Sequence, residues 1–338
     1  MVYSQVGGAS LFQFLNQSDN SRIMGVGGLN VSTKDDDVDM LTQNPSSLDS
    51  IHVQELSINY LPYFTDINKT SLLYTFNTKK IGALAISSSY ISYGEFERKD
   101  IYDQRNGTFS ARDFSFGVTN SHQINNISVG ATMKFAGSYI DTYSSHAVAF
   151  DFGANFTHPK YDLQVGMVLK NIGFVFDGYV GGANLDLPMD LQIGVSYKPE
   201  YMPIRFSATG FNLLTNEAYY FDASRNPDFD DQGNQIEGEK SVAEEIFRRI
   251  IWGAELMFSE KFQIQAGYNH MRRQELKLKD VGGVSGFSVG GKLKIKGYDI
   301  GFTRAWYHAA GGTSVFSVST NLSRYYKKTK VEGTNTRS

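Results

Sequence analysis

Carboxylates are the side chains of this chain with the clearest potential for chemistry, and one run of them has the spacing of a cation site. Asp228, Asp230 and Gln232 alternate along this run, and Glu239 stands six residues after its glycine. A calcium loop reads Asp-x-Asp-x-Asn/Asp-Gly-x5-Glu, because Ca²⁺ prefers several oxygen ligands. The run approximates that motif, although glutamine replaces the usual Asn or Asp. A solvated acidic loop is therefore the favoured interpretation, and calcium is the one cofactor to test.

The remaining reactive groups do not form a catalytic arrangement. Asp186 with Asp190, and Glu244 with Glu245, look like paired carboxylates, but no second acid or base is placed beside them. The chain has no cysteine, and its six histidines stand apart at positions 52, 122, 146, 158, 270 and 308. Neither a metal site nor a Ser-His-Asp triad follows from that pattern. We therefore expect a protein that is not an enzyme.

The elements that would position these groups are strands. Residues 127–135 read Ile-Ser-Val-Gly-Ala-Thr-Met-Lys-Phe, with an apolar residue at every odd position. Residues 191–197, 262–269 and 287–296 repeat the pattern. Because successive side chains of a strand point to opposite faces, each run has one apolar and one polar face. This is typical of a half-buried soluble sheet or of a transmembrane barrel with a polar interior.

The composition favours the barrel. A chain of 338 residues with a net charge of −3 has no basic field for nucleic acid. No run of about 18 apolar residues is present, so a transmembrane helix is not expected. The 33 glycines, 20 tyrosines and 24 phenylalanines suit aromatic girdles and close-packed interior positions. An outer-membrane protein needs a secretion signal, so we expect a trimmed sequence with a mature start at Gln5; the alternative is a cytoplasmic protein.

About fourteen strands follow from the pattern, an even number as in single-chain bacterial barrels. We predict them near residues 51–64, 68–78, 80–94, 107–121, 124–140, 143–158, 161–172, 187–198, 202–214, 247–259, 261–275, 284–296, 297–309 and 312–325. Gaps after even-numbered strands are all short, whereas several gaps after odd-numbered strands are long, at 95–106, 173–186, 215–246 and 276–283. Outer-membrane barrels have this polarity. The sequence therefore predicts an all-β transmembrane antiparallel barrel in the outer membrane, with extracellular long loops and periplasmic termini.

The two faces of the strands can be assigned residue by residue. The lipid-facing set is apolar: Phe114, Phe116, Val118, Val148, Phe150, Phe152, Phe156, Tyr161, Leu163, Val165, Met167, Leu169, Ile204, Phe206, Ala208, Ala254, Leu256, Phe258, Phe316, Val318 and Leu322. The lumen-facing set is polar: Ser128, Thr132, Lys134, Asp151, Asn155, Gln164, Gln192, Arg205, Glu255, Gln263, Gln265, Lys292 and Lys294. A charge from the second set would cost about 2–4 kcal/mol on the lipid face at the midplane.

Residues 241–251 interrupt the strand pattern with a helical one. Ser241 and Glu244 form a capping box, and Val242, Ile246 and Ile250 fall on one helical face. Such a helix could dock a surface partner or close the mouth of the barrel, and the sequence does not decide between the two.

The first 50 residues differ from the barrel pattern and carry the sharpest motif. Its residues are Arg22, Gly27, Gly28, Asp36, Asp37, Asn44 and Pro45. The order of arginine, Gly-Gly turn, Asp-Asp pair and Asn-Pro-x-x-Leu resembles the entry motif of FadL-like outer-membrane barrels. That resemblance implies a segment folded inside the lumen as a plug, where a buried arginine and aspartate would compensate each other. The alternative is that these residues only cap turns.

A finer resemblance covers most of residues 5–325. The segments at 5–16, 143–153 and 170–173 are similar to the PorQ family of the type IX secretion system in Bacteroidota. The resemblance implies a component of the attachment complex, which also contains PorU, PorV and PorZ, and in which PorQ holds PorZ at the outer face. The polar tail after Tyr326 departs from many barrels, and the loop at 215–246 is long.

The sequence thus predicts a plug segment at 1–50, a barrel at 51–326 and a polar periplasmic tail at 327–338. The expected function is a lipid-embedded, non-enzymatic anchor for a PorZ-like surface protein in the attachment complex, without nucleic acid. The alternative is a FadL-type transporter of hydrophobic small molecules, which requires a lateral opening and an apolar pocket under the outer loops. The polar lumen positions count against transport, and a folded plug counts against a diffusion porin.

Overall fold

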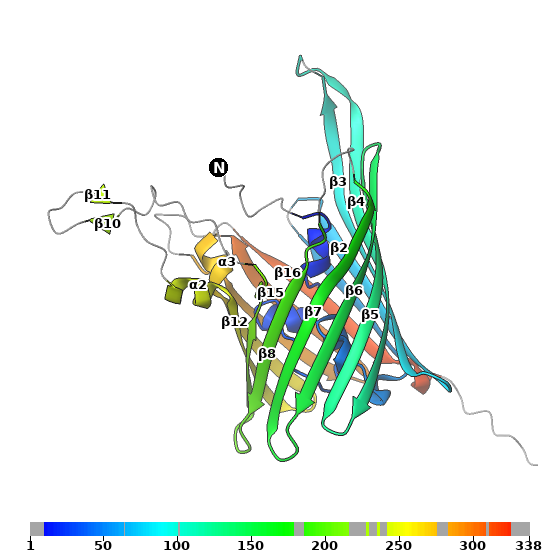
Figure 1. Cartoon of the computed structure of the whole chain (residues 1–338), viewed down its shortest axis with the longest axis vertical. Helices are drawn as coiled ribbons and strands as arrows, with labels where there is room; N and C mark the ends of the chain where they lie inside the picture. The colour runs from blue at the N-terminus through cyan, green and yellow to red at the C-terminus, as the bar shows by residue number, and fades with distance from the viewer. Residues whose placement is uncertain are drawn as a thin grey trace, which may run out of the picture.

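The chain forms a closed antiparallel β-barrel (Figure 1). The structure, a computed structural model, describes residues 10–63, 65–100, 102–178, 186–215, 228–229, 235–236, 242–275, 283–308 and 311–325. Fourteen strands close the barrel in the order β1-β16-β15-β14-β13-β12-β9-β8-β7-β6-β5-β4-β3-β2, and β10 pairs only with β11. The predicted fold class, an all-β antiparallel barrel of about fourteen strands, is confirmed.

The strand bounds follow the predicted ranges closely. The strands are β1 (Glu55–Pro62), β2 (Asn68–Thr78), β3 (Gly82–Lys99), β4 (Arg105–Ile124), β5 (Ile127–Ile140), β6 (Tyr143–Thr157), β7 (Asp162–Asp177), β8 (Asp190–Lys198), β9 (Ile204–Gly210), β10 (Asp228–Phe229), β11 (Gln235–Ile236), β12 (Ile250–Ser259), β13 (Phe262–Asn269), β14 (Phe287–Ile295), β15 (Tyr298–His308) and β16 (Gly311–Asn321).

The strands alternate between an apolar outer face and a polar inner face, as predicted. Between β4 and β5, Phe116 lies opposite Phe135 on the outer face, and the hydroxyls of Thr119 and Thr132 lie 2.7 Å apart on the inner face. Phe116 is 54% exposed, whereas Thr132 is buried. Exposed large apolar side chains recur in this way on most of the barrel strands. Among the described residues, no helix is long and apolar enough to cross a membrane.

The strands β3 and β4 extend further than predicted. Because β3 continues to Lys99 and β4 begins at Arg105, most of the predicted loop at 95–106 is a two-stranded hairpin that rises above the rest of the barrel (Figure 1). The backbone ladder continues through this hairpin, and Phe96 stacks on Phe109 across it. Its charged residues break the apolar alternation, which is why the sequence pattern ended earlier.

Two other predictions of secondary structure need correction. Residues 270–275, predicted as the end of a strand, form the helix α3 (His270–Glu275), and the side chain of Asn269 accepts a hydrogen bond from a backbone N–H at its start. The predicted helix at 241–251 is present as α2 (Val242–Arg248). However, Ile250 already begins β12, so it cannot share a helical face with Val242. Ser241 lies outside the described residues.

The interior of the barrel holds residues 10–52, which we call the lumenal segment. It contains η1 (Gln13–Asn16), α1 (Ser21–Gly25), η2 (Val38–Thr42), η3 (Pro45–Ser47) and η4 (Ser50–His52), and a last short helix, η5 (Leu322–Arg324), follows β16. The side chains of Asn20, Asp37 and Asn44 cap α1, η2 and η3 by accepting backbone N–H groups. The helix α1 packs against β13–β16 and η3 against β4–β6, so the segment contacts opposite parts of the wall.

The lumenal segment runs from one end of the barrel to the other. Ser10 pairs with Asp186 beside the long loop after β7, whereas His52 leads into β1 at the short-turn end. The described chain therefore begins at the long-loop end, because the segment crosses the lumen first, and Tyr325 contacts Tyr298 at the short-turn end. Residues 1–9 and 326–338 lie outside the described residues, so the periplasmic position of the termini stays a prediction.

Candidate functional site

A buried ionic network on one side of the lumen is centred on Arg22, which is part of α1. The Arg22 guanidinium donates to both carboxylate oxygens of Asp35, at 2.9 and 2.7 Å, and its Nε donates to Glu255 Oε1 on β12 at 2.6 Å. The contact between Arg22 and Asp37 is longer, at 3.3 Å. The planar fork of arginine suits such bidentate pairing, and through it Arg22 joins two parts of the lumenal segment to the wall.

Two cations of the wall extend the network. Arg205 on β9 donates to Asp35 Oδ2 at 2.6 Å, and Lys292 on β14 donates to Asp37 Oδ2 at 3.0 Å. Buried charges are tolerated when each has a well-placed partner. The pairs Arg205–Asp35 and Lys292–Asp37 satisfy that condition. The network therefore fixes the lumenal segment to β9, β12 and β14.

Burial and pairing act in opposite directions on the carboxyl groups of the network. Burial alone would raise the pKa of Asp35, but Arg22 and Arg205 hold that pKa well below its usual range. Burial also opposes ionisation of Asp37, whose pKa is nevertheless lowered by Lys292 and Arg22. Both carboxylates are consequently ionised at neutral pH, and their ion pairs are intact there.

Asp39 differs from the other two aspartates. Its oxygens accept hydrogen bonds from Ser57 at 2.7 Å and from Asn59 at 3.1 Å, and none of the ion pairs found in the described ranges includes it. Burial, together with the negative charge of Asp37, raises the pKa of Asp39 to about 7. A large fraction of this carboxyl is therefore neutral at physiological pH.

Glycines of the wall allow the backbone of the lumenal segment to lie directly against the strands. A Cβ on Gly267 would stand 2.0 Å from the nitrogen of Gly27, and a Cβ on Gly153 would stand 2.0 Å from Oδ1 of Asn44. The turn at Gly27 and Gly28 has φ values of +104° and +107°, which glycine adopts without steric cost. The segment therefore fits the wall in shape as well as in charge.

The structure brings most of the predicted motif residues to the lumen, with one difference among the aspartates. Of the two predicted motif aspartates, only Asp37 contacts Arg22. Asp36 is exposed near the short-turn end, with Lys294 at 3.8 Å. Asp35, which the motif did not single out, lies closest to Arg22 among the three aspartates of this run.

The Asn-Pro part of the motif holds the segment by hydrogen bonds. Asn44 Oδ1 accepts from the Ser46 backbone N–H at 3.1 Å, and Asn44 Nδ2 donates to the Val31 carbonyl at 2.8 Å. Pro45 begins η3, where a missing N–H costs nothing. The alternative interpretation, that these residues cap turns, also agrees with these contacts. Asn44 caps η3 and also donates to the Ala154 carbonyl of the wall, so the same side chain forms the cap and attaches the turn to the wall.

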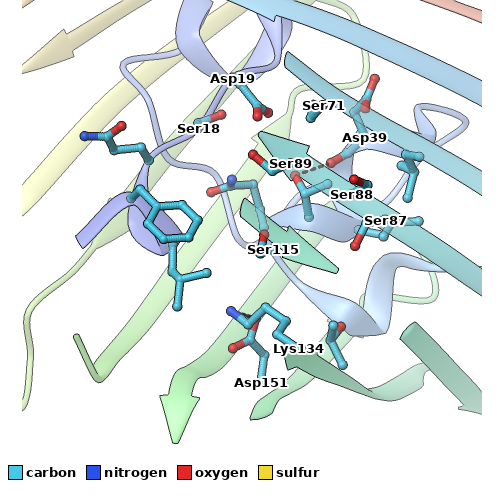
Figure 2. A pocket seen from close by; sticks show the side chains of 18 of the residues that line it. Ser18, Asp19, Asp39, Ser71, Ser87, Ser88, Ser89, Ser115, Lys134 and Asp151 are labelled. Atoms are coloured by element: carbon cyan, nitrogen blue, oxygen red, sulfur yellow. Dashed lines mark hydrogen bonds and ion pairs between the residues drawn. The ribbon is translucent and has the colours of Figure 1, made fainter. Parts of the chain in front are cut away.

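The other side of the lumen contains a cavity of about 100 Å³, shown in Figure 2, which we call the β2–β7 cavity. Residues 14–19 and 41–43 bound it, together with Asp39 and the inner faces of β2–β7. The wall contributes hydroxyl groups and three lysines: Ser71, Ser87, Ser89, Ser115, Thr119, Thr132, Lys69, Lys134 and Lys170. The lining is therefore suited to a polar occupant.

Aromatic side chains of the lumenal segment occupy the apolar part of the lumen near the long loops. Phe12 and Phe14 are buried against Ile91, Ala147 and Ala149 of the wall. A transporter of hydrophobic small molecules needs an apolar pocket below its outer loops. In this molecule the two rings fill that position.

The structure does not test the candidate calcium site. Asp228 contributes its backbone to β10, and its side chain lies outside the described residues, as do Asp230, Gln232 and Glu239. Elsewhere in the described ranges, no group of three or more His, Cys, Asp or Glu side chains could hold a metal ion. Calcium binding at this loop remains a prediction.

Sequence reasoning placed Arg205, Glu255 and Lys292 in the lumen but did not connect them to Arg22. Arg205 and Glu255 lie directly opposite each other in the β9–β12 register, although the segment 211–249 separates the two strands in the chain. Opposite charges at inward positions of consecutive strands are the signal that could have found this pair.

Comparisons with known proteins agree with the fold. No protein-family model matches the chain, and neither does any curated protein. The solved structure of a TodX monoaromatic hydrocarbon channel mutant is similar, with a TM-score of 0.52 and 12% identity over 89% of this chain and 98% of the other. The Ralstonia pickettii toluene transporter TbuX gives 0.49 and 11%, covering 91% and 99% of the two chains. A Pseudomonas aeruginosa FadL homologue gives 0.46 and 11%, covering 90% and 98%.

Identities this low show the fold alone, and the TodX match supports the barrel. The membership in the PorQ family that the sequence suggests is not confirmed.

Proposed function

We propose that the chain is a non-enzymatic outer-membrane barrel that holds a surface protein at its long-loop end. In the finer form of the proposal, it acts as PorQ does in the type IX attachment complex, with a PorZ-like partner and with PorU and PorV nearby. The observation that carries the proposal is the lumenal segment, which a buried ionic network fixes to three strands of a closed barrel. A channel needs a lumen that its cargo can enter, whereas an anchor needs a rigid body and an outer surface.

The outer face of the barrel supports a membrane location. Val118, Met133, Phe152, Met167 and Phe206 are each about half exposed, although they are large and apolar. A soluble protein rarely exposes contiguous apolar patches of more than a few hundred Å². Strands with this alternation and an even strand number are typical of bacterial outer-membrane barrels, so lipid is the proposed environment of this face.

The β3–β4 hairpin supplies an ordered outer surface for a partner. Phe109 precedes the buried Ala111 by two residues on β4, so the Phe96–Phe109 pair lies on the lumen side of the sheet and not on the lipid side. Phe96 is still 41% exposed. A protein seated over the barrel mouth could contact this pair, in addition to the loops at 173–186 and 215–246 that the sequence suggested.

The anchor role can be tested by shortening the outer surface. One variant replaces residues 96–109 with a two-residue turn, and a second lacks residues 222–240. We expect both to insert normally and to lose the partner. Residues 96–109 pair only with one another among the described residues, and the loop at 215–246 is predicted to lie outside the strand pairs that close the barrel. The measurement is co-elution of the PorZ-like protein from detergent-solubilised outer membrane. Heat-dependent migration in SDS verifies the barrel, since a closed sheet has no free edge from which to unravel.

The matched control changes the opposite end of the barrel. Lys79→Ala combined with Lys80→Ala alters the exposed turn between β2 and β3. This double variant should keep the partner. If the partner also stays on both shortened variants, the anchor proposal is withdrawn.

Transport of hydrophobic small molecules is the second candidate, and the similarity to TodX favours it. The lumen counts against it, because Phe12 and Phe14 fill the apolar site. A second cavity of about 300 Å³ below the loops includes Asp190, Gln192 and Arg272 in its lining. Uptake of a labelled aromatic hydrocarbon and of a long-chain fatty acid, with and without the chain in the outer membrane, tests this candidate. Faster uptake with the chain, together with no effect on a surface partner, would replace the anchor by a transporter.

A further inference from the structure

The β2–β7 cavity has room for more than one water molecule. Its volume of about 100 Å³ is several times the roughly 10–15 Å³ of such space that one water requires. It therefore accommodates either a small group of waters or one small polyatomic ion. The side chains around it decide between these occupants.

Lys170 on β7 is a buried cation that has no carboxylate within ion-pair distance in the described ranges. It is 3% exposed and lines the cavity. Within the described residues its ammonium donates to the Thr42 carbonyl alone, at 3.5 Å. An ammonium group has three donors, and burial of an unpaired charge is costly. Lys170 can therefore donate to a further group in the cavity.

The other two lysines of the cavity differ from Lys170 because each already has a carboxylate. Lys134 lies 2.8 Å from Asp151, and Lys69 lies 3.5 Å from Asp19. Each of these lysines is therefore paired with its own carboxylate. Asp190 lies opposite Lys170 in the β7–β8 register but outside ion-pair distance, so no carboxylate contacts Lys170 directly. Asp39 also lines the cavity but balances Lys170 only in part, because burial raises its pKa to about 7.

Three polar atoms of the cavity lining are buried without a hydrogen-bond partner in the described part of the chain. They are the hydroxyl oxygens of Ser18 and Ser89 and Oε1 of Gln43. Gln43 is 4% exposed, so its carbonyl oxygen has no access to bulk water. Two hydroxyls can donate to an occupant, whereas Gln43 Oε1 can only accept. An occupant that satisfies all three must carry both acceptor and donor oxygens.

We propose that the β2–β7 cavity binds a small oxyanion that retains a hydroxyl group, such as hydrogen phosphate or bicarbonate. Lys170 neutralises its charge, the Ser18 and Ser89 hydroxyls donate to its oxygens, and its own hydroxyl donates to Gln43 Oε1. The bound anion joins the lumenal segment, through Ser18 and Gln43, to the wall strands β3 and β7. This site is independent of the proposed surface role.

The experiment compares anions of different chemistry on the full chain. The protein is refolded from urea into detergent micelles that contain about 20 mM sodium phosphate, bicarbonate, acetate or chloride, and further sodium chloride brings all four solutions to one ionic strength. This anion concentration is well above a site dissociation constant in the sub-millimolar range. We expect phosphate or bicarbonate to raise the unfolding temperature by roughly 5 °C over chloride. Acetate, which has no hydroxyl, should raise it less. The anion that acts distinguishes a phosphate site from a carbonate site.

Variants link the effect to this cavity. Lys170→Gln should abolish the anion-specific rise, whereas Lys79→Gln, at an exposed turn, should keep it. Because Lys170→Gln could impair folding, Gln43→Glu serves as a second variant: it keeps Lys170 and supplies the negative charge itself. The Gln43→Glu protein should be stable in chloride and insensitive to phosphate. Equal unfolding temperatures in phosphate, bicarbonate and chloride for the unmodified chain would show that the cavity holds water only and would overturn the proposal. An anion effect that persists in both cavity variants would mean that the anion binds elsewhere, and it would overturn the proposal as well.

Discussion

The two sides of the lumen bury charged groups in different ways. On the β9–β14 side, Arg22 has three carboxylates within 3.3 Å, and cations of the wall supply the rest of the balance. On the β2–β7 side, Lys170 has no carboxylate within ion-pair distance among the described residues, and hydroxyl groups surround an open volume. The charged groups of the first side are paired with one another. On the second side Lys170 lacks a carboxylate, and three polar atoms of the cavity lining have no hydrogen-bond partner among the described residues. The comparison separates a structural attachment from a site that can take a ligand.

The difference should be visible first in the cost of removing a charge. Arg22→Met would leave the buried carboxylates of Asp35 and Glu255 with Arg205 as their remaining arginine. Removal of one partner from a buried ion pair costs on the order of 3–5 kcal/mol. We expect a comparable loss of stability, measured as the temperature at which heat-dependent migration in SDS is lost.

The control for Arg22→Met is an exposed ion pair. Arg98 contacts Asp141 at the outer end of the barrel, and its side chain is 45% exposed. Pairs of that kind contribute about 0–1 kcal/mol, so Arg98→Met should have little effect. Equal losses in the two variants would mean that the network does not fix the lumenal segment.

A substitution of a wall glycine should have the next largest effect. Gly267→Ala would bring a Cβ to 2.0 Å from the nitrogen of Gly27, whereas in Gly291→Ala the nearest atom is the Gln263 carbonyl oxygen at 3.5 Å. Overpacking costs about 1–3 kcal/mol, so Gly267→Ala should be the less stable protein in urea-induced unfolding. Similar midpoints for the two variants would show that the segment yields easily at this contact.

The pH dependence should distinguish Asp39 from the paired aspartates. Its folded-state pKa of about 7 lies above the unfolded value near 3.9, so the folded state binds the extra proton between these limits. The contribution of Asp39 to stability is therefore largest at low pH and is lost as the pH rises from about 4 to 7. Asp35 and Asp37 act in the opposite direction, because their lowered pKa values remove stability only as the pH falls below about 4.

Asp39→Asn isolates this effect. Asparagine can still accept through its carbonyl oxygen, but it does not titrate. Unfolding temperatures at pH 5 and pH 8 should differ less in the variant than in the unmodified chain. The same pH response in both proteins would exclude Asp39 as its source.

The smallest expected effect compares a serine of the cavity with a serine of β16 that contacts α1. Ser115 lines the β2–β7 cavity, whereas Ser317 Oγ accepts from the Ser21 backbone N–H at 2.8 Å. Ser317→Val would leave that buried N–H without a partner, at a cost of about 1–3 kcal/mol. Ser115→Val should change the stability by less than about 1 kcal/mol, because the cavity has room for the added methyl group. Urea midpoints measure both, and the reverse order would contradict the assignment of free space to the β2–β7 side.

Much of the barrel could be predicted from the sequence because each strand carries its own period-two pattern. The alternation through Val129 and Met133 predicts both the strand and its outer face without reference to any other part of the chain. The charged run at 95–99 hides the extension of β3, since its outer part packs against neither lipid nor a core. For α3, the local cap at Asn269 outweighed the continuation of the strand.

The candidate site was less predictable because it depends on contacts between distant segments. Arg22 and Glu255 are 233 positions apart, and their contact requires both the register of β12 and the path of the lumenal segment. The cavity beside Lys170 exists because the lumenal segment does not cover the whole inner face of β2–β7. Neither the Arg22–Glu255 contact nor this cavity produces a pattern within a single stretch of the sequence.

The path of the lumenal segment also has a mechanical consequence. The segment begins beside Asp186 at one end of the barrel and joins β1 at the other, and the pairing of Glu55–Tyr60 with β16 closes the wall around it. It is therefore enclosed by a continuous hydrogen-bonded sheet and cannot move out sideways while the sheet is intact. A pull on the chain before Ser10, directed outward along the axis, would act in shear on the Arg22 network and on the contacts at Gly153 and Gly267. The force would pass through the lumen to the opposite rim before any strand separates.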